Sequence, residues 1–297
     1  KIPNCIPQRL IRELRCMKNA PEGVVLQLID GVERMAKGHK LPAEKFIEYF
    51  DAFDMVYTYD RYEAEKYGFV YAPLPLKKFE IDITSKRTPK VFFCGRAKDR
   101  LEQIKAIAIL LEQYGIDYEF LVLKQDNVPC EDIGNIHFIN YLKYDLVVKH
   151  IEQATCLLSL VAGDANMMPA SYTESVIYNK KLLTNCKFLS DLPFYNEKYM
   201  KNFQDVNDID FEWLRTNDDV EYNYTNEFSA AYFLDMVAQD YQRGSLRRCA
   251  ELNKRIIENG KAVIKFAYHF AKIGWLEDIE NFQPVVVENQ LEAISIK

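Results

Sequence analysis

The residues around Gly95 have the types and order of a site for a diphosphate group. Gly95 and Arg96 follow the apolar run 90–94, and Arg100 stands at the start of a helical pattern. A glycine lets the backbone approach a ligand closely, and a helix N-terminus offers free N–H groups. Two arginine side chains can each bind phosphate oxygens through paired N–H groups. The alternative is a turn glycine beside charges that face solvent, because a single strand-glycine-arginine-helix pattern is a weak signal.

Glu174 has a type and position that suit the binding of ribose hydroxyl groups. It lies near the start of the helical pattern 171–178, after the loop that follows the apolar run 155–160. A carboxylate can accept hydrogen bonds from both hydroxyl groups of a ribose. The alternative is an acid in the first turn that interacts favourably with the helix dipole. The residues alone leave both interpretations open.

Asp60 is the candidate catalytic residue. It follows the apolar run 53–59, where a carboxylate can accept the proton of an acceptor hydroxyl group or bind a sugar hydroxyl group. It also precedes the helical pattern 61–67, where an aspartate is a good N-cap. The two roles are compatible with each other. Asp30, after the run 24–29, is a weaker candidate of the same kind.

Asp208 and Asp210 have the D-x-D spacing with which one class of metal-dependent enzymes, glycosyltransferases of a different fold, holds a divalent cation. Carboxylate oxygens suit Mg²⁺ or Mn²⁺. A loop and a helix start at this place would explain the two residues equally well. Ligand spacing is absent among the four histidines, His39, His137, His150 and His269. We therefore expect no metal site.

Short apolar runs alternate with amphipathic stretches along most of the chain, which is the pattern of βαβ units and a mostly parallel sheet. The runs expected to be strands are 24–29, 53–59, 69–72, 90–94, 118–123, 136–139, 155–160 and 181–185. The stretches expected to be helices are 61–67, 99–114, 144–153 and 171–178. Ligands of such α/β sheets collect at the carboxyl ends of the strands, where the candidates above are expected.

Two prolines and the polar stretch 77–89 interrupt this alternation. Proline excludes regular structure at and before its own position, so we place a domain boundary there. From 226 to 274 the apolar residues have helical spacing. The expected parts are an N-terminal, acceptor-side domain 1–85, a donor-binding domain 86–225 and a helical C-terminal extension 226–297.

Five segments carry a resemblance to a known family. They are 54–68, Pro73-Leu74-Pro75, Phe93-Cys94-Gly95 with Arg100, Thr173-Glu174-Ser175 and 180–185. Over about 24–233 the chain resembles bacterial capsular and lipopolysaccharide glycosyltransferase-like proteins, in which these segments recur in this order. The resemblance implies the GT-B architecture, two Rossmann-like domains facing across a cleft. The second domain would hold a nucleotide-sugar, and the first is short in this chain.

The resemblance also implies roles for single residues. Contacts to the donor diphosphate are implied for Gly95, Arg96 and Arg100. Contacts to the donor ribose and sugar are implied for Glu174, Thr173 and Tyr172. The chain departs from the family in the stretch 167–172, which replaces an Arg or Gly commonly found before the glutamate.

We therefore expect a hexosyltransferase-like glycosyltransferase of surface-polysaccharide biosynthesis. It would move a sugar from a nucleotide-sugar donor to a glycan or lipid-linked acceptor. Arg96 and Arg100 would stabilise the departing diphosphate in place of a metal, and no cofactor is expected. One alternative is a non-catalytic nucleotide-sugar-binding partner or scaffold of a polysaccharide assembly complex. Another is a nucleotide-sugar epimerase, which would need more acids and histidines around the cleft.

Charge is unevenly distributed along the chain, whose net charge is -6. Eight cations between 242 and 272 face only two acids, Glu251 and Glu258; the cations are Arg243, Arg247, Arg248, Lys254, Arg255, Lys261, Lys265 and Lys272. A nucleic-acid-binding protein would carry a broader basic surface, so we expect no nucleic-acid partner. The segment 242–272 would pack on the first domain as a helix or contact the anionic inner face of the plasma membrane.

Composition and cysteine spacing indicate an ordinary globular protein of the cytoplasm. Hydrophobic residues make up 48% and charged residues 28% of the chain. The apolar runs are much shorter than the roughly 20 residues of a membrane-spanning helix. The seven cysteines form no C-x-x-C pair, so we expect reduced thiols rather than a zinc site or a disulfide framework.

Overall fold

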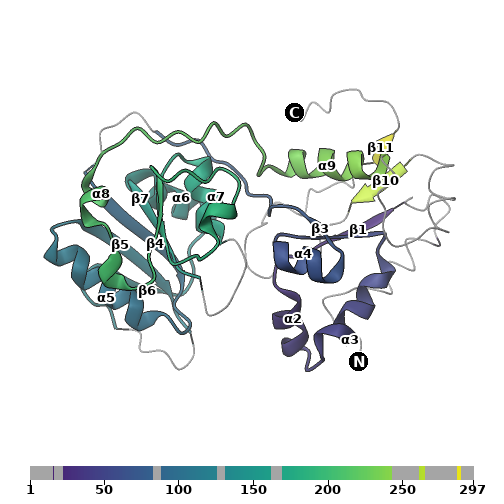
Figure 1. Cartoon of the computed structure of the whole chain (residues 1–297), viewed down its shortest axis with the longest axis horizontal. Helices are drawn as coiled ribbons and strands as arrows, with labels where there is room; N and C mark the ends of the chain where they lie inside the picture. The colour runs from purple at the N-terminus through teal and green to yellow at the C-terminus, as the bar shows by residue number, and fades with distance from the viewer. Residues whose placement is uncertain are drawn as a thin grey trace. The chain divides into compact units, whose positions relative to one another are not determined.

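The computed structural model describes residue 16 and residues 23–82, 88–125, 131–161, 169–242, 261–264 and 286–288. The chain divides into two compact units (Figure 1). Unit 1 combines Lys1–Pro75 with Phe228–Lys297, and unit 2 is Leu76–Glu227. The chain therefore passes from unit 1 to unit 2 and back again. The first passage, after Pro75, lies ten residues before the boundary that we expected after residue 85.

Unit 1 is built on a five-stranded sheet with the order β11-β10-β1-β2-β3, in which only β11 is antiparallel to its neighbour. Its strands are β1 (Val24–Gln27), β2 (Met55–Thr58), β3 (Val70–Tyr71), β10 (Lys261–Ile264) and β11 (Val286–Glu288). Its helices are α2 (Val32–Gly38), α3 (Ala43–Ile47), the 3-10 helix η1 (Glu48–Ala52), α4 (Arg61–Tyr67) and α9 (Ala230–Gln242). All residues of β1 and β2 are buried, which explains why both strands are apolar except for their last residues, Gln27 and Thr58.

Helix α9 belongs to the core of unit 1. Its Phe233 and Val237 pack with Val25, Met55 and Tyr57 of the sheet. The helical pattern expected over 226–274 thus holds for α9, whereas Lys261–Ile264 form strand β10, parallel to β1. So short an apolar run fits a helix or a strand by spacing alone, and pairing with β1 decides between them. The remaining residues of the basic segment 242–272 beyond α9 and β10 lie outside the described residues.

Unit 2 is built on a six-stranded, wholly parallel sheet with the order β6-β5-β4-β7-β8-β9. Its strands are β4 (Lys90–Arg96), β5 (Asp117–Leu123), β6 (Ile136–Ile139), β7 (Cys156–Ser159), β8 (Lys181–Thr184) and β9 (Met200–Asn202). Its helices are α5 (Leu101–Gln113), α6 (Tyr144–Gln153), α7 (Ala170–Ile177) and α8 (Phe211–Arg215), with 3-10 helices η2 (Leu189–Asp191) and η3 (Val206–Asp208).

Counted along the chain, the strands of unit 2 stand in the order 3-2-1-4-5-6, which is the doubly wound order of the Rossmann fold. Helices α5 and α8 share a hydrophobic core with one face of the sheet. Helix α6 packs on β4, and α7 packs on β7 and β8 (Figure 1). The predicted α/β, Rossmann-like fold is therefore confirmed. The two domains facing across a cleft stay a prediction.

Candidate functional site

The order of the strands in unit 2 reverses between β4 and β7, which lie side by side. In open α/β sheets, ligands bind outside the carboxyl ends of the strands at such a switch point. Strand β4 ends at Arg96 and β7 ends at Ser159. Gly95 and Arg96 thus stand at the switch point. They are the last two residues of β4 rather than the turn after it, because the strand extends two residues beyond the predicted run 90–94 and pairs with β5.

The packing of the described residues does not require a glycine at position 95. It is not among the glycines with a positive φ angle. A Cβ atom added to it would meet the ring of its near neighbour Phe93 at 3.4 Å, which is an ordinary contact. A Cβ atom at residue 95 would therefore meet no described residue other than Phe93 within 4 Å.

Arg100 directs its guanidinium group at the protein backbone. Its Nε donates to the carbonyl oxygen of Ala97 at 3.1 Å, and its Nη2 donates to that of Arg96 at 2.7 Å. Its Nη1 donates to the carbonyl oxygen of Leu160, just after β7. The side chain is only 13% exposed. Arg100 thus ties the ends of β4 and β7 together, while the neighbouring Arg96 is exposed.

The chain that leaves β7 is also held from the side of β8. Asn185, directly after β8, accepts a hydrogen bond from the Val161 N–H at 2.6 Å and donates one to the Val161 carbonyl oxygen at 3.2 Å. Residues 162–168, which follow, lie outside the described residues. Arg100 and Asn185 therefore hold the backbone of residues 160 and 161, just after β7.

Glu174 lies in α7 against residues of β4 and α6. Burial raises its pKa to about 7, and the nearby Tyr144, the first residue of α6, offsets this only in part. Burial, and then the charge of Glu174, raise the pKa of the Cys94 thiol in β4 to about 12. The carboxyl group therefore points into the layer between the sheet and its two covering helices, close to the carboxyl end of β4.

Tyr172 and Thr173 precede Glu174 in the same helix and are buried, at 1% and 5% exposure. Tyr172 accepts a hydrogen bond at its backbone carbonyl oxygen from the Ser175 hydroxyl group at 2.7 Å. Their expected contacts with a donor sugar stay predictions. Both side chains are part of the packing of α7.

Three residues near Glu174 escaped the sequence analysis. Cys94 and Tyr144 interact with it electrostatically, and the buried Ser159 hydroxyl group at the end of β7 has no hydrogen-bond partner within the described part of the chain. Cys94 and Ser159 each lie two residues beyond the last pair in the β4–β7 register, Phe92 with Leu157. The available signal was the position of each residue at the carboxyl end of a predicted strand or the start of a predicted helix.

In unit 1, Asp60 is the N-cap of α4, as one of the two interpretations predicted. Its Oδ1 accepts a hydrogen bond from the Glu63 N–H at 3.1 Å, and the side chain is buried. Burial raises the pKa of Asp60 despite the hydrogen bonds from backbone N–H groups, which lower it. The catalytic role expected of Asp60 stays a prediction. Asp30 pairs with Arg34 at 3.1 Å on the surface of α2.

Glu63 is a buried carboxyl group that the sequence analysis did not single out. Its Oε1 accepts from the Val32 N–H at 2.5 Å, at the start of α2, and its Oε2 accepts from the Thr58 hydroxyl group at 3.4 Å. Burial raises its pKa to about 7 against the effect of the Val32 hydrogen bond. Glu63 therefore caps a helix that is distant in sequence.

Asp208 and Asp210 act as helix caps in the structure. The Asp208 side chain accepts from the Asp205 N–H at 3.1 Å within a capping box. Asp210 accepts from the Trp213 N–H at 2.9 Å and from the Lys201 ammonium group at 2.7 Å. The loop and helix start that we considered for this pair account for both residues. Within the described ranges, no group of three or more His, Cys, Asp or Glu side chains could hold a metal ion.

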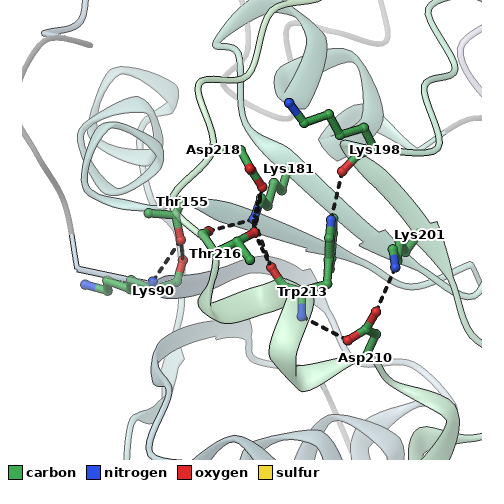
Figure 2. A network of polar contacts seen from close by, with 9 residues as sticks. All are labelled: Lys90, Thr155, Lys181, Lys198, Lys201, Asp210, Trp213, Thr216 and Asp218. Carbon is green, nitrogen blue, oxygen red and sulfur yellow. Dashed lines mark hydrogen bonds and ion pairs between the residues drawn. The ribbon is translucent and has the colours of Figure 1, made fainter.

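Two buried lysines hold the opposite, amino-terminal edge of the unit 2 sheet. Lys180 donates to the carbonyl oxygens of Glu152 and Ala154 at the end of α6, at 3.1 and 2.7 Å. Lys181, the first residue of β8, reaches the end of α8 (Figure 2). Lysine side chains at helix C-termini satisfy carbonyl groups that have no partner within the helix.

The ammonium group of Lys181 has several oxygen partners. It donates to the carbonyl oxygens of Trp213 and Thr216 at 2.9 and 2.6 Å and to the Thr216 hydroxyl group. It also pairs with an Asp218 carboxylate oxygen at 3.0 Å, and Figure 2 shows these contacts converging on one nitrogen. The hydrogen bonds with Thr216 and Lys181 lower the pKa of Asp218. The Lys181 ammonium group therefore has its hydrogen-bond and ion-pair partners within the protein.

No family model and no curated protein matches the chain. Among solved structures, 29 chains match. The glycotransferase of kitacinnamycin is 9% identical with a TM-score of 0.33, over 86% of this chain and 66% of that chain. The structure of accessory secretory proteins 1, 2 and 3 of Streptococcus pneumoniae matches with 12% sequence identity and a TM-score of 0.40, over 84% of this chain and 56% of that chain. The spinosyn forosaminyltransferase SpnP matches with 11% identity and a TM-score of 0.31, over 79% of this chain and 65% of that chain.

This chain thus spans less than two thirds of the length of each of those chains. The assignment of a Rossmann-like fold rests on the strand order of unit 2 rather than on these similarities. A helix long and apolar enough to cross a membrane does not occur in the part of the chain that the structure describes.

Proposed function

We propose that the carboxyl edge of the unit 2 sheet binds a nucleotide-sugar and that the protein is a glycosyltransferase. The observation that carries the proposal is the position of Gly95, Arg96 and Glu174 at the switch point of a sheet with the order 3-2-1-4-5-6. Arg96 is exposed and free to bind phosphate oxygens, and α5 starts just beyond it. The sequence resemblance to capsular and lipopolysaccharide glycosyltransferase-like proteins supports the same ligand.

Arg100 takes a different part from the one that the resemblance implies. Its N–H groups donate to the carbonyl oxygens of three residues, so we assign it to holding the carboxyl end of β4 rather than to binding the diphosphate directly. Arg96 would then stabilise the leaving diphosphate together with the N–H groups at the start of α5. We propose this without a metal ion. Activity that is lost with EDTA and restored by Mn²⁺ would contradict it.

The proposed reaction moves a sugar to a hydroxyl group of a glycan or lipid-linked acceptor in surface-polysaccharide assembly, in the cytoplasm. Asp60 would be the base for that hydroxyl group. The basic segment 242–272 would bring the enzyme to the inner face of the plasma membrane. Co-sedimentation with anionic vesicles tests the last point, because exchange of Arg247, Arg248, Lys254 and Arg255 for glutamate should abolish it.

A non-catalytic nucleotide-sugar-binding protein is the second candidate. The observation that favours it is the burial of Asp60, whose carboxylate serves as a helix cap. A thermal-shift panel of nucleoside diphosphates and their sugars, followed by a hydrolysis assay with each stabilising sugar, separates the two functions. A ligand that binds only the folded state must raise the unfolding temperature. Stabilisation without turnover would favour the binding protein, and no stabilisation by any nucleotide would contradict both.

A further inference from the structure

Ser159, the last residue of β7, has a buried hydroxyl group without a hydrogen-bond partner in the described part of the chain. Its side chain is only 2% exposed. Most buried polar groups of folded proteins have a partner, because a group without one makes the folded state less stable. Ser175 in α7 follows that rule, since its buried hydroxyl group donates to the Tyr172 carbonyl oxygen at 2.7 Å. Ser159 therefore has a donor and an acceptor that the described residues leave unused.

The alternation of side chains along β7 gives the direction in which Ser159 points. Successive side chains of a strand lie on opposite faces of the sheet. Leu158 and Leu160 belong to the core that the sheet shares with α5 and α8, so Ser159 lies on the other face. Helix α7 contributes no residue to that core and packs on β7 and β8. Ser159 therefore faces the layer between the sheet and α7, to which Glu174 belongs.

The backbone directly after Ser159 is held from both sides. Arg100 donates to the carbonyl oxygen of Leu160 from the side of β4. Asn185 accepts from the N–H of Val161 at 2.6 Å and donates to its carbonyl oxygen at 3.2 Å, from the side of β8. Because the next two residues are fixed, the backbone has little freedom to turn the Ser159 hydroxyl group toward another partner.

The surroundings of Ser159 favour a hydroxyl group of the ligand as its partner. The carboxylate of Glu174 can only accept hydrogen bonds, so a ligand hydroxyl group must donate to it. The oxygen of that hydroxyl group can still accept a hydrogen bond, and the Ser159 hydroxyl group is able to donate one. A phosphate oxygen would fit less well, because the charge of Glu174 would repel it.

The burial of Ser159 has two consequences for binding. A hydrogen bond formed away from water is electrostatically stronger than one formed in water. The ligand reaches the buried oxygen only if at least one side chain at the carboxyl edge moves. Rotamer changes of this kind are common when proteins bind their partners.

We propose that Ser159 is a ligand-contact residue whose hydroxyl group donates to a hydroxyl group of the nucleotide-sugar that Glu174 also binds. This inference rests on the proposed function. The ribose and the transferred sugar both carry hydroxyl groups, so either one supplies the required chemistry. The Ser159 hydroxyl group lowers the stability of the free protein and finds its partner in the complex. Its removal should therefore change stability and ligand affinity in opposite directions.

The first experiment measures chemical denaturation of the whole protein without ligand. Ser159→Ala removes a buried hydroxyl group without a partner, and we expect the unfolding equilibrium constant to fall roughly fivefold. Ser175→Ala is the matched control, because it removes a buried hydroxyl group that has a partner, and the constant should rise roughly fivefold. A rise in Ser159→Ala would show that this hydroxyl group already has a partner within the protein and would overturn the inference.

The second experiment measures the binding of uridine diphosphate, guanosine diphosphate, UDP-glucose and GDP-mannose to the same variants by calorimetry. Ser159→Ala should bind the ligands of the wild type roughly tenfold more weakly. Ser175→Ala should keep its affinity although it is less stable. An equal loss for a nucleotide and its sugar assigns Ser159 to the ribose, and a loss for the nucleotide-sugar alone assigns it to the transferred sugar.

Two failures of this experiment are distinguishable. Wild-type affinity in Ser159→Ala for every ligand that the wild type binds would overturn the role of Ser159 and leave the proposed function intact. Binding of none of the four ligands by the wild type would contradict the proposed function, and the role of Ser159 would fall with it.

Discussion

The two edges of the unit 2 sheet use their polar residues in opposite ways. At the amino edge, Lys180 and Lys181 are buried, and carbonyl oxygens at the ends of two helices surround their ammonium groups. At the carboxyl edge, Arg96 is exposed, and Glu174 is held in a layer where burial favours its neutral form. The first arrangement completes the fold, and the second leaves donors and acceptors for a ligand.

Arg100 shows that neighbouring residues at one edge can also differ in whether their side chains bind the protein or face solvent. It stands at the carboxyl edge, yet its guanidinium group serves the backbone in the way that Lys181 does. Residue type and position in the sheet are therefore not sufficient to identify a ligand contact. The partners that a charge already has within the protein decide whether it can bind anything else.

Exchange of Lys181 should give the largest effect. Lys181→Met removes the charge that Asp218 and the carbonyl oxygens of Trp213 and Thr216 share, so we expect the free energy of unfolding to fall by about 3 to 5 kcal/mol. Lys187→Met, at an exposed lysine after the same strand, should change it by less than about 0.5 kcal/mol. Chemical denaturation measures both. Equal effects in the two variants would remove the contrast between the edges.

Glu174→Gln should change how stability depends on pH. The pKa of Glu174 is about 7 in the folded protein, against 4.5 as the ordinary value. The folded state therefore binds the proton more tightly, and wild-type stability should fall by up to about 3 kcal/mol as the pH rises from about 4.5 through 7.

Glu174→Gln mimics the neutral carboxyl group and should lose this part of the slope. Glu63 has a raised pKa of about 7 as well, and burial also raises the pKa of Asp60, so these two carboxyl groups should contribute to the slope that remains. Glu44→Gln, at an exposed glutamate, is the control. Denaturation curves recorded between about pH 4 and pH 8.5 test this. A slope that is the same in Glu174→Gln and wild type would contradict the burial of this carboxyl group.

Exchange of Arg100 should lower stability, whereas exchange of Arg96 should weaken ligand binding. Arg100→Ala leaves the carbonyl oxygens of Leu160 and Arg96 without their donor, and we expect a loss of about 1 to 3 kcal/mol in the free energy of unfolding. Arg96→Ala should leave stability within about 0.5 kcal/mol and weaken binding of a nucleoside diphosphate by about 1.5 to 3 kcal/mol. Denaturation and calorimetry on the same two variants decide this. Destabilisation by Arg96→Ala would place Arg96 with the structural residues.

Gly95→Ala should have only a small effect on stability. Its backbone conformation suits alanine and the new Cβ atom would meet only the Phe93 ring at ordinary contact distance, so unfolding should change by less than about 1 kcal/mol. Binding of a nucleoside diphosphate should nevertheless weaken, because the methyl group occupies the space left for it. Gly38→Ala, with nothing within 4 Å of its Cβ position, is the matched control. Full binding by Gly95→Ala would separate Gly95 from the site.

The spacing of apolar residues, together with the glycines and prolines between the apolar runs, predicted most of the fold. The expected strand 136–139 and helix 144–153 agree with β6 and α6 residue by residue, and Gly68 ends α4 with a positive φ angle of 69°. Strand β9 was missed because the three residues Met200–Asn202 are too few to show a period. Helices α2 and α3 were missed because each is short and lies between stronger signals.

The candidate site was predictable in place but not in detail. The position of Gly95, Arg96 and Glu174 after predicted strands was enough to bring them to one edge of the sheet. The sequence contains no signal that distinguishes a guanidinium group that binds carbonyl oxygens from one that faces solvent, which is why Arg100 and Arg96 looked equivalent. The electrostatic effects that join Tyr144 and Cys94 to Glu174 link three elements that only the packing of the sheet brings together.

Hydrogen exchange across unit 2, with and without a saturating nucleoside diphosphate, tests the central claim most directly. Binding at the carboxyl edge should protect the backbone amides of 95–101 and 171–178 and leave those around Lys181 and Thr216 unchanged. The amino edge thus provides the internal control within the same sample. Protection of the amino edge, or of neither edge under conditions in which calorimetry shows that the nucleotide is bound, would contradict the assignment of the site.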